Sequence, residues 1–417
     1  MAMLITNIRF LINTREENKL LRGAALSHLP IIENAFLIID NGLVAAFGPM
    51  DQLAYRRKDF SEQIDAAGRS ILPSWCDSHT HLVFAGSRES EFVDKIKGLS
   101  YAEIAAKGGG ILNSARKLNA TSEQELFSQS WNRLQEVIRM GTGAIEIKSG
   151  YGLTVEGEIK MLRVIRKLKE KSPIPIKASF LGAHSVPEDY KNNKEGYIRL
   201  IIDEMLPVIG QEKLADYIDV FCEQGFFTPD ETKLICKAGK DYGLKPKIHA
   251  NQLHVSGGVQ AGVEMNAVSV DHLESMDDAA IQSLANSNTI GTLLPTAAFF
   301  LRMPFQPARQ LIENNCAIAL ASDFNPGSSP SGNMNFVVAL SCIQMRMLPA
   351  EAINAATVNG AYAMELQDEV GSISVGKKAN FIITKPIPSI ETLPYYFGHD
   401  MIDRVMVNGE CFARHSF

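Results

Sequence analysis

Short apolar segments rich in β-branched residues recur eight times between residues 76 and 324, and this rhythm limits the fold more than any other feature. The segments are CDSHTHLVF (76–84), GAIEIKS (143–149), IKASFLGAH (176–184), YIDVFCE (217–223), KPKIHAN (245–251), AVSVDHLE (267–274), TIGTLLP (289–295) and AIALASDF (317–324). Strands that are apolar on both faces and alternate with helices form parallel sheets. Eight such units predict an α/β fold with a (β/α)8, TIM-like barrel, and an open doubly wound sheet is the alternative.

Helix start signals lie between these segments. Ser122 is followed by Glu125 ahead of an amphipathic pattern, and Thr228 is followed by Pro229 and Glu231. These residue types cap helix N-termini, with the acid placed to bond back to the capping residue. The signals predict helices between the strands, as a barrel requires.

Chemically capable side chains lie at the ends of nearly all the predicted strands. They are His79 and His81, Lys148, His184, Glu223, His249, His272 with Glu274, and Asp323. Barrel enzymes build their active sites at the C-terminal ends of the strands, where such residues surround one opening. This placement favours the barrel over the open sheet.

The two flanks of the chain have a different pattern. Residues 35–48 indicate a hairpin around Asn41 and Gly42, and short strands with turn residues follow at 371–384 and 403–412. Neither flank has enough strand to bury a face alone. We therefore expect residues 1–72 and 366–417 to form one small β-sandwich domain, with the barrel over residues 73–365.

Composition narrows the class of protein. The 41 basic and 47 acidic residues are well mixed and give a net charge of −6, which argues against a nucleic-acid surface. The six cysteines are scattered without a CxxC pair, and this is typical of a reducing compartment. No apolar run reaches the roughly 18 residues of a membrane helix, and no signal-peptide pattern is present. We expect a cytoplasmic protein that has no membrane or nucleic-acid partner.

The DSHTH stretch at residues 77–81 predicts a metal site. Side chains two residues apart on a strand share a face, so His79 and His81 can converge on one cation. An HxH pair alone arises easily by chance. His249, His272 and Asp323 at the mouth of the same barrel make coincidence hard to sustain, and the mixed nitrogen and oxygen set suits zinc or iron.

A metal at this mouth indicates hydrolysis, because a metal can lower the pKa of a bound water to near 7. Asp323 can bind the metal and take the proton of that water, while His272 orients or polarises the carbonyl under attack. Amide or amidine hydrolysis of this kind needs no organic cofactor. Two alternatives stay open: Glu223 with His184 and His272 completes a second metal site, or Glu223 and Lys148 form a buried ion pair or support the ligands.

Several stretches resemble the amidohydrolase superfamily, and the similarity covers essentially the full length. They are DSHTHLVFAGSRESEF, EIKSGYGL, FLGAH, KIHANQL, SVDHLE, SDFNPGSS and the tail GSISVGKKANFII, in which Asn380 stands where an Asp is more usual. The GSRESEF and KSGYGL stretches are far more specific than the HxH pair. Within the superfamily, the chain is similar to the members that open an imidazolone ring in histidine degradation.

The resemblance implies a set of site residues. One divalent or trivalent zinc or iron ion would be held by His79, His81, His249 and Asp323, with Asp323 and His272 catalytic. The implied reaction is hydrolysis of the cyclic amide of 4-imidazolone-5-propanoate to N-formimidoyl-L-glutamate by a metal-activated water. The implied substrate-binding residues are Arg88, Tyr151, His184, Gln252, Asn325, Gly327 and Ser328. A homodimer is the expectation at the level of the family.

Two other functions compete with this interpretation. Ring deaminases of the superfamily carry an acid three residues after the histidine of the fifth strand, to move protons to the departing ammonia. Here that position is Gln252, which cannot titrate but can bind a ring edge as donor and acceptor. A non-catalytic assembly protein of the same fold would be expected to lose metal ligands, and here all are present. Ring opening is therefore favoured over both.

Overall fold

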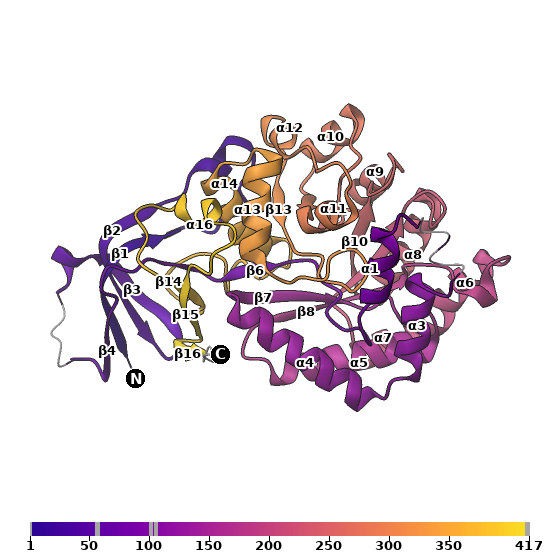
Figure 1. The fold of residues 1–417 in the computed structure, drawn as a ribbon, viewed down its shortest axis with the longest axis horizontal. Helices are drawn as coiled ribbons and strands as arrows, with labels where there is room; N and C mark the ends of the chain where they lie inside the picture. Colours follow the sequence, from indigo (N-terminus) through magenta and orange to yellow (C-terminus); the bar gives the residue numbers. More distant parts are fainter. Residues whose placement is uncertain (1, 55–58, 100–102, 104–106, 413–417) are drawn as a thin grey trace.

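Two eight-stranded sheets organise the computed structural model, which describes residues 2–54, 59–99, 103 and 107–412. One sheet is parallel and lies at the centre of the larger, helix-rich part of the molecule (Figure 1). The other combines strands from both flanks of the chain and lies beside it. The molecule thus has the two parts that the strand pattern predicted.

The parallel sheet is a closed barrel. Its strands pair in chain order, and they are β6 (Trp75–Asp77), β7 (Thr142–Lys148), β8 (Ile176–Ala183), β9 (Tyr217–Cys222), β10 (Lys245–Ala250), β11 (Ser269–His272), β12 (Ile290–Leu293) and β13 (Ile318–Leu320). The segments that follow β6 and β13 close the ring through a parallel bridge between Thr80 and Phe324. The backbone N–H of His81 donates to the Phe324 carbonyl at 2.9 Å, and that of Asp323 donates to the His79 carbonyl at 3.0 Å. The barrel prediction is confirmed.

The first and last barrel strands are shorter than their apolar patterns indicated. β6 ends at Asp77 and β13 at Leu320, so His79, His81 and Asp323 all lie just beyond regular strand. The reason is a side chain that replaces the backbone ladder. The Asp77 carboxylate accepts hydrogen bonds from the Ser322 N–H at 2.9 Å and the Ser322 hydroxyl at 2.5 Å.

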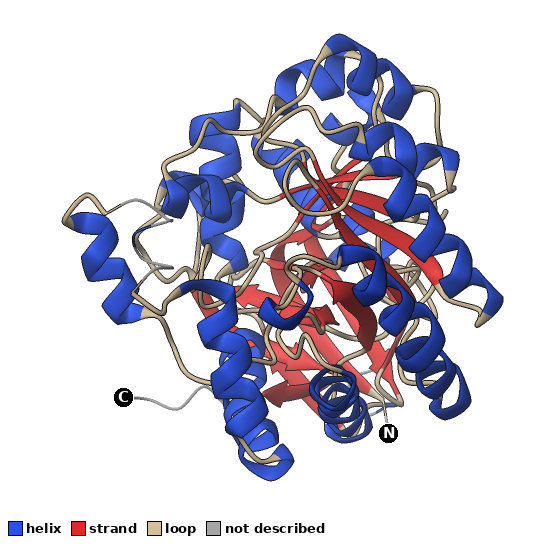
Figure 2. Cartoon of the chain, turned by 90° about the vertical axis from the view of Figure 1, so that its right-hand side faces the viewer, coloured by secondary structure: helices blue, strands red, loops and turns tan. Residues whose placement is uncertain are grey.

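Helices surround the barrel strands (Figure 2). The α-helices are α1 (Glu89–Ile96), α3 (Gly110–Ala120), α4 (Glu123–Arg139), α5 (Val155–Lys171), α6 (Lys194–Leu200), α7 (Leu206–Glu212), α8 (Pro229–Asp241), α9 (Gly258–Glu264), α10 (Asp278–Ala285), α11 (Pro295–Leu301), α12 (Ala308–Glu313), α13 (Met334–Met345), α14 (Pro349–Ala356), α15 (Val358–Tyr362) and α16 (Thr392–Tyr395). Shorter turns of helix are η1 (Gly23–Ser27), η2 (Met50–Gln52), η4 (Glu188–Tyr190) and η5 (Ile201–Met205).

Both predicted helix starts are confirmed. The Ser122 side chain accepts a hydrogen bond from the Glu125 N–H at the start of α4. Thr228 and Glu231 form a reciprocal capping box at the start of α8. Each interaction satisfies backbone donors that the first turn of a helix leaves free.

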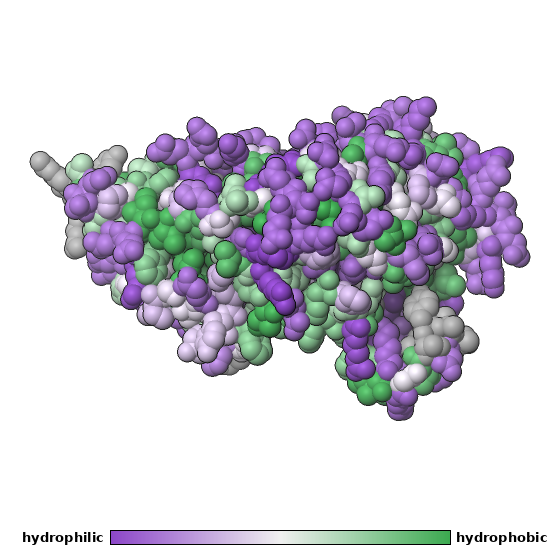
Figure 3. All heavy atoms as spheres, turned by 90° about the horizontal axis from the view of Figure 1, so that it is seen from above, coloured by the Kyte–Doolittle hydropathy of each residue, from purple (hydrophilic) through white to green (hydrophobic). Residues whose placement is uncertain are grey.

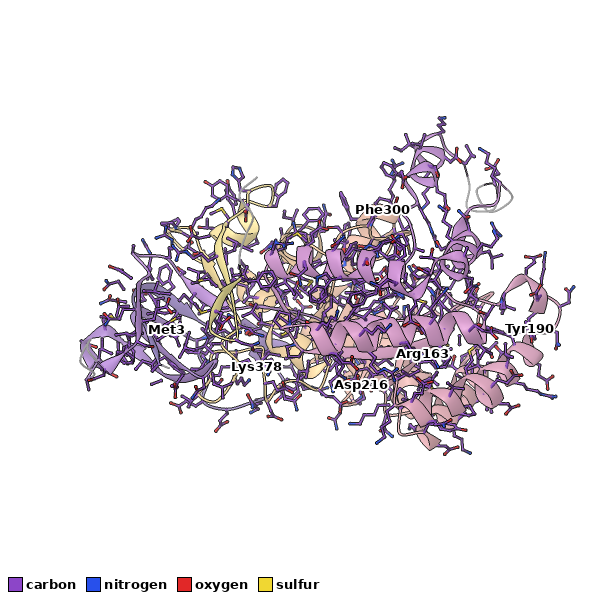
Figure 4. All side chains as sticks on the ribbon, turned by 90° about the horizontal axis from the view of Figure 1, so that it is seen from below. Met3, Arg163, Tyr190, Asp216, Phe300 and Lys378 are labelled. Carbon is purple, nitrogen blue, oxygen red and sulfur yellow. The ribbon has the colours of Figure 1, made fainter. Side chains whose placement is uncertain are left out.

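The second sheet joins the two flanks. Its strands are β1 (Met3–Ile12), β2 (Ile31–Asp40), β3 (Leu43–Pro49), β4 (Glu62–Asp65), β5 (Ile71–Pro73), β14 (Phe381–Thr384), β15 (Ile402–Val407) and β16 (Glu410–Phe412). β14 pairs with β5, which connects the C-terminal strands to the N-terminal ones. Asn41 and Gly42 have φ values of 49° and 77° in the β2–β3 turn, as the predicted hairpin requires. Ile5, Leu37 and Phe381 share the core of this sheet, and Figure 4 labels Met3 and Lys378 at this end of the molecule.

Asn380 links the small sheet to the barrel. Its amide nitrogen donates to the Gly143 carbonyl at 3.0 Å, and its amide oxygen accepts from the Asn408 N–H at 2.8 Å. An ionised aspartate accepts hydrogen bonds but cannot donate one. The asparagine that departs from the more usual Asp therefore makes a contact with the barrel that an ionised Asp could not make.

The surface fits the mixed composition. Seen from above, it is mostly hydrophilic, with a hydrophobic area over the small sheet (Figure 3). Cys76, Cys222, Cys236, Cys316, Cys342 and Cys411 are free thiols. In the described ranges, no helix has both the length and the apolar character needed to cross a bilayer.

Candidate active site

Three histidines and an aspartate converge at the C-terminal end of the barrel. The Nε2 atoms of His81 and His249 are 3.4 Å apart. The Nε2 atoms of His79 and His81 each lie 3.5 Å from Oδ1 of Asp323. All four side chains are buried. The structure thus brings together the four residues that the sequence predicted as metal ligands.

Two buried aspartates orient two of these imidazoles. Nδ1 of His79 lies 2.7 Å from Asp271, and Nδ1 of His249 lies 3.0 Å from Asp219. A carboxylate at Nδ1 fixes the ring so that it donates there and keeps the Nε2 lone pair free. Burial, reinforced by Lys148, holds the pKa of His79 well below its usual range, which keeps the ring neutral. Both rings thus turn their Nε2 atoms toward the space they share.

The geometry and chemistry fit one transition-metal ion. Ligand atoms about 2.0–2.1 Å from a tetrahedral ion lie roughly 3.3–3.4 Å from one another, close to the separations found here. His79 Nε2 is buried and, among the described residues, has no hydrogen-bond partner, although buried polar atoms ordinarily have one. A set of three imidazoles and one carboxylate suits zinc or iron.

His272 stands beside this group in a strained conformation. Its ring centroid lies 5.2 Å from that of His249, and the ligand atoms of His79, His272 and Asp323 lie within 4.8 Å of one another. Its φ is 89°, a conformation that costs energy for a residue other than glycine. Although burial opposes the charged form, Glu274 raises the pKa of His272, with Oε1 3.5 Å from Nδ1. The pair can hold a proton next to the convergent atoms.

Aromatic rings line one side of the convergent histidines. The His184 ring stacks on His81 at 5.3 Å between centroids, and Tyr151 lies 5.5 Å from His184. His184 Nδ1 is 2.9 Å from the Gly150 carbonyl, to which it can donate a proton. Gly150 has a φ of 111°, which a residue with a Cβ rarely adopts. The buried Glu158 carboxylate accepts N–H bonds from Gly150, Gly152 and Leu153 and so shapes the loop that carries Tyr151.

Arg88 reaches the same opening from the start of α1. Its guanidinium lies 5.8 Å from the Tyr151 ring centroid, and its Nε donates to the Ser114 hydroxyl at 2.8 Å. A Cβ on Gly327 would lie 2.5 Å from Arg88 Nη1, so the glycine leaves room for the guanidinium. The structure therefore brings Arg88, Tyr151 and Gly327 together, although they come from three separate loops.

A tight turn after β13 carries Asn325, Gly327 and Ser328. The Asn325 side chain accepts from the N–H groups of Gly327 and Ser328, each at 2.8 Å. The Ser328 hydroxyl donates to Oδ2 of Asp323 at 3.1 Å. The turn that the resemblance implied for substrate binding thus also holds the Asp323 carboxylate.

Glu223 anchors the loop that carries Gln252. Its carboxylate accepts from the Leu253 N–H at 2.8 Å and lies 3.2 Å from His254 Nδ1. His254 thus helps to fix the loop, in which Gln252 is 9% exposed. The groups of described residues that could hold a metal do not include Glu223. Over the ranges that the structure describes, the predicted alternative of a second metal site at Glu223, His184 and His272 is therefore not supported.

Among the described ion pairs, Lys148 does not pair with Glu223, so the predicted ion pair between these two residues is wrong. Its Nζ instead contacts Glu146 at 2.6 Å and Asp219 at 2.8 Å. The sequence interpretation missed Asp219 and Asp271 because they lie inside apolar strands and not at strand ends. A charged residue within an otherwise apolar barrel strand was the signal available, since such a position faces either the packed interior or the helices.

Comparisons with known proteins agree with this architecture. The model of the Amidohydrolase family matches residues 70–411. Imidazolonepropionases from Flavobacterium johnsoniae and Christiangramia forsetii are 58% and 54% identical over 411 residues, covering 98% of this chain and 100% of each relative. The crystal structure of an adenosine deaminase from Xanthomonas campestris with bound zinc is 14% identical, with a TM-score of 0.68 over 98% of this chain and 92% of that one.

These likenesses carry different weight. Identity of 14% to a solved structure supports the shared fold alone, because one fold hosts many functions. Identity above 50% over nearly the whole of both chains is a family relationship. The chain belongs to the imidazolonepropionase family of amidohydrolases.

Proposed function

We propose that the protein is a metal-dependent hydrolase that opens the cyclic amide of 4-imidazolone-5-propanoate to give N-formimidoyl-L-glutamate. The observation that carries the proposal is the convergence of the buried ligand atoms of His79, His81, His249 and Asp323, which lie 3.4–3.5 Å apart where they approach one another. A relative of 58% identity bears the name imidazolonepropionase, and this supports the choice of substrate.

We propose that these four residues hold one zinc or iron ion. Such an ion, when bound, supplies a Lewis acid that lowers the pKa of a water and polarises a carbonyl. The adenosine deaminase of similar fold contains zinc, which supports zinc as one of the two candidates. The donor set accepts either metal.

Asp323 and His272 are assigned the proton transfers. Burial raises the pKa of Asp323, so its carboxylate is suited to accept a proton from the attacking water. Ser328 holds Oδ2 of that carboxylate at 3.1 Å. The His272 and Glu274 pair is suited to pass a proton to the ring nitrogen as the amide opens. The nitrogen stays attached to the product, so no group has to protonate a departing ammonia.

The propionate of the substrate is assigned to Arg88. A planar guanidinium binds a carboxylate through two parallel hydrogen bonds, and Arg88 lies at the mouth beside Tyr151. Tyr151 and His184 would contact the flat imidazolone ring, and Gln252 would bind its edge. Asn325, Gly327 and Ser328 complete the opposite side of the pocket.

The deaminase alternative is not favoured. Gln252 occupies the position at which ring deaminases carry the acid that moves protons to ammonia, and an amide does not titrate. The likeness to an adenosine deaminase is one of fold. A neutral residue at this position is compatible with ring opening, because His272 can carry the proton.

A direct assay tests the proposal. Enzymatically generated 4-imidazolone-5-propanoate should lose its ultraviolet absorbance when purified, metal-replete protein is added. Ammonia release from a panel of purines and pyrimidines serves as the comparison. Absence of turnover on the imidazolone together with ammonia release from a nucleobase would reverse the assignment.

We also propose a setting for this activity. The free thiols support a reducing, cytoplasmic compartment. The excess of acidic residues supports a small-molecule substrate without a nucleic-acid partner. A homodimer and the division into residues 73–365 and a discontinuous domain of residues 1–72 and 366–417 remain proposals from the resemblance and the strand pattern.

A further inference from the structure

A network of buried charges fills the barrel beneath the convergent histidines. Its members are Glu146 and Lys148 on β7, Asp219 on β9, Lys247 on β10 and Asp271 on β11, and all five side chains are fully buried or nearly so. Interiors of (β/α)8 barrels are normally filled by branched apolar side chains. This layer is therefore an exception that needs a physical reason.

Stability does not supply that reason. Removing an ion from water costs on the order of several kcal/mol, and replacing a buried ion pair by apolar residues of similar volume is often neutral or stabilising. Two buried lysines and three buried carboxylates are thus a poor way to hold a barrel together. A charge arrangement of this kind is better explained by the side chains that it orients.

Lys148 connects the two carboxylates that support the metal-binding histidines. Its Nζ donates to Oδ2 of Asp219 at 2.8 Å and lies 3.6 Å from Oδ2 of Asp271. Asp219 uses its other oxygen for Nδ1 of His249 at 3.0 Å. Asp271 holds Nδ1 of His79 at 2.7 Å. One ammonium group therefore lies behind both imidazoles, on the side away from the convergent Nε2 atoms.

The positions of the strands explain why Lys148 can contact both Asp219 and Asp271. β9, β10 and β11 are consecutive in the barrel, with His249 paired to Asp271 in register. Lys148 lies at the end of β7 and is fully buried. Without a cation between them, the two carboxylates would repel each other, and each would be free to turn away from its histidine.

Lys247 has a different role in the same layer. Its Nζ bonds to Glu146 and donates to the carbonyls of Ser78 at 3.1 Å and Ala363 at 3.2 Å. None of its hydrogen bonds or ion pairs is to Asp219 or Asp271 among the described residues. The link to both supporting carboxylates is thus particular to Lys148.

We propose that Lys148 is a positioning residue for the metal site, acting through Asp219 and Asp271 to hold His249 and His79 with their Nε2 atoms facing one ion. This inference rests on the metal site of the proposed function. It assigns to Lys148 no contact with substrate. It predicts that loss of the ammonium group weakens metal binding even where the barrel remains folded.

The test measures zinc affinity by competition with a chromophoric chelator at fixed pH. Lys148→Met should weaken zinc binding by about 10- to 100-fold, the usual effect of losing an outer-shell partner. Lys377→Met removes another buried lysine, 5% exposed and outside the barrel network, and serves as the matched control with wild-type affinity. Thermal unfolding of the metal-free variants reports any general loss of stability. Equal affinity of Lys148→Met and wild type, or equal weakening in both variants, would overturn the inference.

A double-mutant cycle tests the route through the carboxylates. In an Asp219→Asn, Asp271→Asn background, Lys148→Met should change zinc affinity by less than about 3-fold, because the link is already broken. A merely structural role for Lys148 predicts the same loss in both backgrounds, and that result would contradict the proposal.

Two other outcomes have to be distinguished from the loss of the Lys148 role, namely a variant that does not fold and a wild-type protein without a metal site. If Lys148→Met is insoluble, Lys148→Arg is compared with Lys377→Arg, since each keeps the charge but moves it. Weaker zinc binding in Lys148→Arg alone supports the proposal, and equal binding in both contradicts it. A wild-type protein that binds neither zinc nor iron would overturn the metal site as well. Normal wild-type binding with an unaffected Lys148→Met overturns only the role of Lys148.

Discussion

Nδ1 of His79 and Oδ2 of Asp271 form a buried hydrogen bond of 2.7 Å, which turns the other nitrogen of the ring toward Asp323. The bond links β11, the sixth strand of the barrel, to the segment that follows β6, the first strand. It fixes which nitrogen is free before any ligand arrives, so the site is organised by the fold itself.

The first prediction concerns this bond. Asp271→Asn should weaken zinc affinity by about 10- to 100-fold, because an amide holds the His79 tautomer less well than a carboxylate does. Chelator competition measures the change, and Asp203→Asn on the exposed surface is the control. Wild-type affinity in Asp271→Asn would show that the orientation of His79 does not depend on this contact.

The second prediction concerns Arg88. Arg88→Ala should raise KM for the imidazolone substrate by an amount equivalent to about 1.5–3 kcal/mol, the range for a hydrogen bond to a charged group. The metal content should stay at the wild-type value, since the described contacts of Arg88 are with residues other than the four proposed metal ligands. Arg116→Ala, which removes an exposed arginine of α3, should behave as wild type. An unchanged KM in Arg88→Ala would remove the residue from its role as the carboxylate clamp.

The third prediction concerns the loop that carries Gln252. Glu223→Ala should release the N–H groups of Leu253 and His254 from their shared acceptor. Each lost hydrogen bond to a charged acceptor is worth about 1.5–3 kcal/mol. Because only part of this free energy affects how Gln252 binds substrate, KM should rise by roughly 10-fold. Glu223→Gln should raise KM by a smaller factor than Glu223→Ala does. Elemental analysis should find unchanged metal content, whereas loss of metal would return Glu223 to the role of ligand.

The fourth prediction concerns pH and Lys377. Burial lowers the pKa of Lys377 to about 8, and its Nζ donates to the Ser372 hydroxyl at 2.7 Å. The pKa of a lysine in an unfolded chain is about 10.4. Between about pH 8 and 10.4 the unfolded state therefore binds more protons than the folded state, and the free energy of unfolding rises with pH. Below pH 8 both states are protonated and the contribution is constant.

The comparison of wild type with Lys377→Met isolates this contribution. The difference in free energy of unfolding should shift in favour of wild type by about 1–3 kcal/mol from pH 7.5 to 10, as a pKa difference of this size requires. Thermal unfolding across that range measures it. Parallel pH curves for the two proteins would show that the lysine titrates normally in the fold.

The barrel and the convergent histidines and aspartate could be predicted from the sequence for a simple reason. Buried parallel strands are continuous apolar runs, and polar residues at their ends stand out against them. His79, His81, His249 and Asp323 were found in this way. The resemblance added Arg88 and Tyr151, which a single sequence leaves among ordinary loop residues.

The supporting layer could not be predicted, because it depends on which strands lie beside one another and on their register. Lys148 and Glu223 both end barrel strands, yet Lys148 turns to Asp219 and Glu223 turns to the loop at Leu253. The early end of β6 at Asp77 has a similar origin, since a side chain contact with Ser322 replaces the backbone ladder. These are contacts between distant parts of the chain that no local pattern encodes.

The most direct measurement is turnover of 4-imidazolone-5-propanoate as a function of metal bound per chain. Protein stripped by a chelator should be inactive, and activity should rise linearly as zinc or iron is added, reaching its plateau at about one ion per chain, the number that one four-residue donor set holds. Alanine in place of His249 should abolish both binding and turnover. Full activity in stripped protein, or a plateau at two ions per chain, would contradict the account of a single metal site.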